Sequence, residues 1–63
     1  MDSKFEKFLE KAIEEERQAS DEYYDVALTV EDRKIQRVLQ SIASDEHKHK
    51  VALERILKYI KMQ

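Results

Sequence analysis

Residues 35–60 read IQRVLQSIASDEHKHKVALERILKYI, and this stretch decides the fold. Its apolar residues recur at alternating steps of three and four, which is the spacing of one face of an α-helix. The apolar members of this stripe are Ile35, Leu39, Ile42, Leu53, Ile56 and Ile60. Two positions of the same stripe are instead taken by Glu46 and His49. The spacing therefore predicts a long amphipathic helix with two polar side chains in the middle of its apolar stripe.

The preceding part of the chain repeats this pattern. Glu16 stands in a second stripe of the same spacing, whose other members are Phe5, Leu9, Ala12, Ala19, Tyr23 and Val26. Between the stripes, Thr29 is the expected N-cap of the second helix, because Thr is among the residue types that cap helices and Asp32 follows three positions later. We predict an all-α chain, with residues 1–63 forming one domain and helices over about residues 3–28 and 31–61.

The composition agrees with long helices. The chain has no Gly, Pro or Cys, and 41% of its residues are charged. Without Gly and Pro nothing breaks the helices, and without Cys there are no disulfides or thiolate metal sites. The net charge of −2 is mixed along the chain, which argues against a nucleic-acid surface, and no apolar run approaches the roughly 20 residues of a membrane span. Residues 1–5 lack the apolar stretch of a secretory signal, so we expect a cytoplasmic location, free or within a larger protein compartment.

The three polar stripe residues are expected to lie in one layer. In an antiparallel hairpin, residues at one level are equidistant from the turn, and the midpoints of positions 16 and 46 and of positions 16 and 49, at 31 and 32.5, both fall at the expected turn. Glu16 should therefore lie opposite Glu46 and His49. Carboxylates in an apolar seam are costly unless they are paired or bound to a metal. The alternative is an ordinary hairpin in which these groups form a buried polar layer that sets the register.

One hairpin supplies three ligands and cannot cover its own apolar stripe. A two-fold copy would supply four Glu and two His in the middle of a closed four-helix bundle, which is the ligand set of di-iron carboxylate bundles. We therefore expect a homodimer or higher homo-oligomer that holds two Fe per dimer. Mn or Zn are the alternative metals for this set of oxygen and nitrogen ligands.

The same residues carry a resemblance to a known family. Residues 12–23, AIEEERQASDEY, look like the first di-iron helix of rubrerythrin-like proteins, and residues 42–49, IASDEHKH, look like the second. The spacing of Glu16, Tyr23 and Glu46 is also similar to that of encapsulated ferritins, which are two-helix chains that complete the ferritin-like bundle between subunits. The resemblance implies that Glu16, Glu46 and His49 are the iron ligands, with Glu46 bridging. Tyr23 is expected either to pack in the core or to hydrogen-bond to a ligand.

The resemblance implies one of two iron activities. Rubrerythrin-like and ferritin-like proteins oxidise Fe(II) with dioxygen or reduce peroxide. A peroxidase cycle would need a separate reductase here, because this sequence has no four-cysteine iron module to return electrons. A ferroxidase draws its electrons from incoming Fe(II), so we expect a ferroxidase. A rubrerythrin-like peroxidase is one alternative, and a non-catalytic helical oligomerisation module with a structural metal, or with none, is the other.

Overall fold

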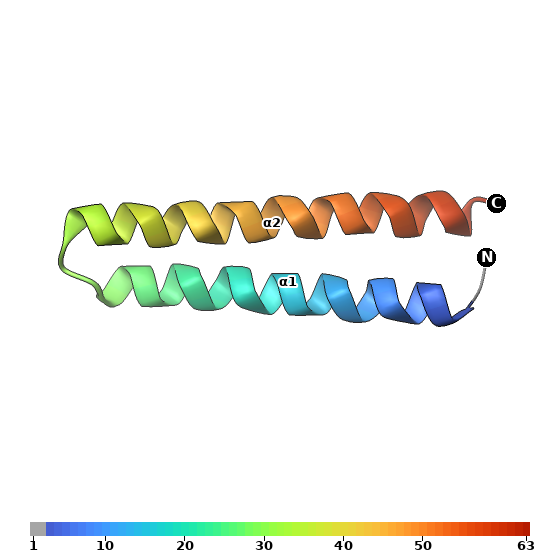
Figure 1. Ribbon diagram of the computed structural model, residues 1–63, viewed down its shortest axis with the longest axis horizontal. Helices are drawn as coiled ribbons and strands as arrows, with labels where there is room; N and C mark the ends of the chain where they lie inside the picture. The colour runs from blue at the N-terminus through green and yellow to red at the C-terminus, as the bar shows by residue number, and fades with distance from the viewer. Residues whose placement is uncertain (1–2) are drawn as a thin grey trace.

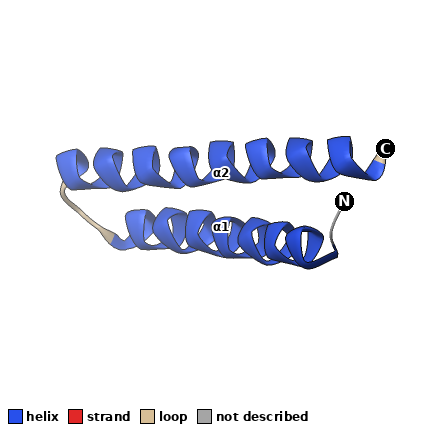
Figure 2. Ribbon diagram, turned by 45° about the vertical axis from the view of Figure 1, so that its right-hand side comes forward, coloured by secondary structure: helices blue, strands red, loops and turns tan. Residues whose placement is uncertain are grey.

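Two antiparallel α-helices joined by a short loop make up the computed structural model, which describes residues 3–63 (Figure 1). Helix α1 spans Ser3–Thr29 and helix α2 spans Arg33–Lys61. The view in Figure 2 shows the helices again side by side, with the start of α1 and the end of α2 far from the loop. The prediction of an all-helical hairpin is confirmed.

The loop covers residues 30–32, whereas the predicted helices left residues 29–30 between them, because α1 continues through Thr29 and Asp32 caps α2 in place of Thr29. The Asp32 carboxylate accepts hydrogen bonds from the backbone N–H groups of Lys34 and Ile35 at 2.9 and 3.1 Å. Thr29 is instead the last residue of α1, where its hydroxyl donates to the carbonyl of Val26 at 2.7 Å. The prediction of Thr29 as the cap was therefore wrong. A carboxylate at a helix N-terminus gains from the helix dipole, whereas the Thr hydroxyl can be satisfied within its own helix.

The core between the two helices is small. Among the described residues, the buried apolar side chains are Leu9, Ala27, Ala43 and Ile60. The radius of gyration is 14.6 Å and the longest dimension is 47 Å, whereas a compact domain of this length would have a radius of gyration of about 11 Å. A single layer of two helices thus buries little of its apolar surface, as small chains do without a metal or a partner.

Much of the predicted apolar stripe is exposed in the single chain. Phe5, Ile35 and Ile56, which the stripe predicts as core, are 38%, 53% and 42% exposed. Helical spacing puts a larger exposed apolar set on the side of the molecule that carries Glu16 and His49. We call this set the open face, and it consists of Phe5, Phe8, Tyr23, Val26, Ile35, Val38 and Ile56. One hairpin therefore leaves large apolar side chains on both sides of the polar cluster without a covering layer.

Neither helix combines the length and the apolar character that a bilayer crossing requires, over the residues that the structure describes.

Candidate metal centre

Glu16 of α1 meets Glu46 and His49 of α2 near the middle of both helices. One ligand atom from each of the three side chains lies within 4.8 Å of the others. The Nδ1 atom of His49 is 3.6 Å from Oε2 of Glu16 and 3.6 Å from Oε1 of Glu46. Glu46 and His49 are three residues apart, so they project from the same side of α2 about one turn apart. The structure thus brings the three polar residues of the stripe into one cluster.

The cluster lies at the border between the interhelical core and the open face. The Glu16 and Glu46 side chains are each 25% exposed, whereas the His49 side chain is 60% exposed. The carboxylates are therefore largely enclosed by their own hairpin, and the imidazole faces outward. A cation at this site would be held from one side by the chain and would be open on the other.

One carboxylate oxygen of the cluster is buried without a hydrogen bond. Oε2 of Glu16 is buried and accepts no hydrogen bond from any described residue. A buried carboxylate oxygen without a partner is costly, and native structures rarely leave one unsatisfied. A bound cation would supply the missing interaction. The 3.6 Å separations between ligand atoms also match the about 3–4 Å expected around an ion with bonds of about 2.0–2.2 Å.

The charges of the cluster favour a cation as well. Burial raises the pKa of Glu46 above its ordinary value, and the neighbouring Glu16 carboxylate raises it further. The imidazole of His49 acts in the opposite direction and lowers this pKa. Two carboxylates and one imidazole are a donor set that suits iron or manganese, and zinc as well. The residues present therefore fit a divalent metal ion.

The raised pKa of Glu46 predicts how the metal-free protein responds to pH. The folded protein favours the protonated form of the Glu46 carboxyl. The contribution of this group to the free energy of unfolding is therefore greatest near or below its ordinary pKa of 4.5, and it is lost as pH rises toward the raised pKa of the folded state. Glu46→Gln should therefore have a higher free energy of unfolding than wild type at neutral pH, and this difference should become smaller toward pH 4.5. Urea unfolding of both metal-free proteins across this range measures the difference. A difference that grows on acidification would show that the pKa is lowered instead.

Tyr23 lies on the open face, two helical turns from Glu16. It is 39% exposed, and no hydrogen bond joins it to Glu16, Glu46 or His49 among the described residues. Its expected role beside a ligand therefore stays a prediction. His47, which the sequence places off the stripe, lines a groove with Ser20, Tyr24, Gln40, Ala43 and Ser44. Helical spacing puts this groove, which we call the back groove, on the side of the hairpin away from the open face.

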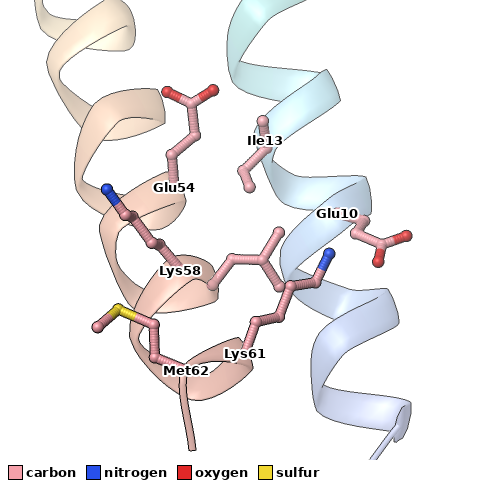
Figure 3. A pocket seen from close by; sticks show the side chains of 7 residues that line it. Glu10, Ile13, Glu54, Lys58, Lys61 and Met62 are labelled. Atoms are coloured by element: carbon pink, nitrogen blue, oxygen red, sulfur yellow. The ribbon is translucent and has the colours of Figure 1, made fainter.

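A second groove near the ends of the chain does not resemble a ligand site. Its volume is about 500 Å³, and its walls include Ile13, Leu57 and Met62. Figure 3 shows that the charged groups around it, on Glu10, Glu54 and Lys58, point in different directions and do not converge on one position. The cluster of Glu16, Glu46 and His49 is therefore the better candidate for chemistry.

The sequence analysis missed one polar residue beside the cluster. The Ser20 hydroxyl donates a hydrogen bond to the backbone carbonyl of Ala43 at 2.9 Å, and so joins α1 to α2. The available signal was a small polar residue four positions after Glu16, on a helix side that the stripe makes otherwise apolar.

The fold and the cluster define a helical hairpin that carries a group of two carboxylates and one imidazole suited to a metal ion. The family model for rubrerythrin matches residues 1–61, and the chain belongs to the rubrerythrin family. Members of this family typically bind iron. No curated protein and no solved structure matches the chain significantly.

Proposed function

We propose that this chain is a ferroxidase, which oxidises Fe(II) with dioxygen or peroxide at a di-iron site built from Glu16, Glu46 and His49. The observation that carries the proposal is the meeting of these three side chains in one layer, with a buried carboxylate oxygen that accepts no hydrogen bond. Membership of an iron-binding family supports iron as the metal. The metals would supply the redox chemistry, and the protein would supply geometry and charge.

Each of the three residues has a distinct place in this proposal. Glu16 presents its orphaned oxygen toward His49 and would bind as a terminal ligand. Glu46 shares the layer with both other groups and would bridge. His49 would be a terminal ligand through Nδ1, the ring nitrogen that faces both carboxylates. Six protein ligands from two copies of the chain would not fill the coordination of two metal ions, so further ligand positions would stay free for an oxidant.

The electron balance favours ferroxidase over peroxidase. Two Fe(II) ions give two electrons to one dioxygen, which takes up two protons and becomes hydrogen peroxide. With hydrogen peroxide as the oxidant, the same two electrons and two protons yield two water molecules. In both cases Fe(II) is the substrate and the source of electrons, so no other reductant is needed. A peroxidase cycle would need an external reductant in every turnover.

The site is proposed to be shared between two copies of the chain. One hairpin offers three ligands for two metals, and its open face is an apolar surface on the side of the cluster. A two-fold copy would cover that face, close a four-helix bundle and bring the total to four Glu and two His. The expected metal content is two Fe per homodimer, with Mn or Zn as substitutes. Burial of the exposed stripe residues would then complete the core that the single chain lacks.

A rapid-mixing experiment tests the activity. The Fe(II)-loaded protein is prepared without oxygen and mixed with dioxygen or with peroxide, while Fe(III) absorbance is followed. A ferroxidase should oxidise Fe(II) with dioxygen faster than buffer does, and it should continue to turn over as Fe(II) is added. Fast reaction with peroxide and almost none with dioxygen would favour the rubrerythrin-like peroxidase.

Variants tie the reaction to the cluster. Glu46→Ala and His49→Ala should lose oxidation by both oxidants, because each removes a ligand. Unchanged rates in both variants would place the reaction elsewhere in the molecule. If the wild-type protein binds no metal, the non-catalytic oligomerisation module is the correct reading.

A further inference from the structure

The side chains of Ser20 and Gln36 each cross from one helix to the backbone of the other. The Ser20 hydroxyl donates to the carbonyl of Ala43 at 2.9 Å, and Nε2 of Gln36 donates to the carbonyl of Ala27 at 2.9 Å. Both accepting residues are buried alanines, which let the helices approach closely enough for these bonds to form. Both bonds are partly buried, so water competes for them less than it does at the surface.

The two bonds lie at different distances from the metal-site residues. Ser20 follows Glu16 by four positions, and Ala43 precedes Glu46 by three, so this bond joins the helical turns next to both carboxylates. Ala27 follows Glu16 by eleven positions, which is about 16 Å along the helix. The bond of Gln36 therefore stabilises the hairpin close to the loop, far from the cluster.

The cluster tolerates little sliding of one helix along the other. A shift by one residue moves a helix by about 1.5 Å, whereas metal-ligand distances are defined to within about 0.2 Å. Apolar side chains alone set this register loosely, because hydrophobic contact has no preferred direction. A hydrogen bond to a backbone carbonyl is directional, and it loses most of its strength when the donor is displaced.

We propose that Ser20 is a positioning residue for the metal site, whose hydrogen bond to the Ala43 carbonyl sets the register of α1 on α2 that brings Glu16 level with Glu46 and His49. This inference rests on the metal site proposed above. Ser20 contacts the backbone on the side of the back groove, and it acts on the metal through the two helices. Its loss should therefore change the geometry and the affinity of the site without removing a ligand.

Binding of Co(II) in the absence of oxygen tests this role, because the visible spectrum of Co(II) reports ligand geometry directly. Ser20→Ala should weaken Co(II) binding by about 10–100-fold, as the loss of a group that orients ligands does, and should alter the spectrum of the bound ion. Ser20→Thr keeps the hydroxyl and should restore most of the affinity and the wild-type spectrum. Ser44→Ala makes the same substitution in the same groove and should behave as wild type, since no described hydrogen bond joins Ser44 to α1.

Two further variants separate the explanations. Gln36→Met removes the other interhelical bond, and it should lower the melting temperature while leaving the Co(II) spectrum unchanged. If Gln36→Met alters the spectrum as much as Ser20→Ala does, general loosening explains the effect and the role of Ser20 is refuted. Glu46→Ala should abolish Co(II) binding. If Glu46→Ala loses Co(II) while Ser20→Ala binds it as wild type does, the proposed metal site is supported and the positioning role of Ser20 is refuted. If Glu46→Ala still binds Co(II), the proposed metal site itself is wrong.

Discussion

Glu16→Ala should abolish iron binding while leaving the metal-free protein as stable as wild type, or more stable. The substitution removes a metal ligand, so the affinity for Fe(II) should fall by more than about 100-fold, beyond the loss seen for groups that only orient ligands. It also removes a buried oxygen that accepts no hydrogen bond, and with it the carboxylate that raises the pKa of Glu46. Alanine, moreover, has the highest helix propensity. The affinity for Fe(II) should thus fall, while the free energy of unfolding of the metal-free protein stays the same or rises.

Leu9→Ala is the matched control for this prediction. Leu9 lies on the same helix and is 1% exposed, so its truncation should destabilise the protein by about 2–5 kcal/mol with or without metal. Anaerobic Fe(II) titration gives the affinities, and thermal unfolding of the metal-free proteins gives the stabilities. Melting of metal-free Glu16→Ala far below wild type would mean that Glu16 serves the fold, as a polar layer that sets the register would require.

Tyr23→Glu should separate the proposed dimer and release its metal together. Tyr23 lies on the open face with an exposed fraction of 39%, two turns from Glu16, where the second copy would cover it. Burying an unpaired carboxylate in an apolar interface costs several kcal/mol, so the dimer dissociation constant should rise by at least about 100-fold. Metal binding should weaken with it, because each ion would need ligands from both chains.

The neighbouring tyrosine provides the control. Tyr24 is 53% exposed and lines the back groove, on the side of the hairpin away from the open face. Tyr24→Glu introduces the same charge into the same helix one residue later, and it should leave the mass and the metal content unchanged. Sedimentation measured across protein concentrations, together with metal analysis of each species, decides the matter. A monomer of either protein that holds iron at full stoichiometry would contradict the shared site.

The spacing of residues was enough to predict the helices and the members of the cluster. The three–four periodicity of both stripes predicts two amphipathic helices, and the absence of Gly and Pro predicts that nothing interrupts them. Distance from the turn along each helix then predicts that Glu16 lies level with Glu46 and His49, as the structure shows. The helices and the level of each residue along them can be predicted in this way, because the rise and the period of a helix depend little on what the helix packs against.

Only the tertiary structure shows which side of each helix contacts the other helix. That choice depends on the sizes and shapes of the side chains that pack together. Ala27 and Ala43 lie outside the predicted stripes, yet they are buried because their small side chains let the helices approach, whereas the predicted core residues Ile35 and Ile56 face outward. The cap of α2 and the hydrogen bond of Ser20 were also beyond prediction, since each depends on which of several nearby polar groups finds a partner in space. A sequence stripe marks the large apolar side chains of a helix, but only the packed hairpin shows which of them the chain buries by itself. For this protein, the repeat spacing determined the helices and the three residues of the polar cluster, and the packing of two helices divided the apolar stripe between an inner core and an open face.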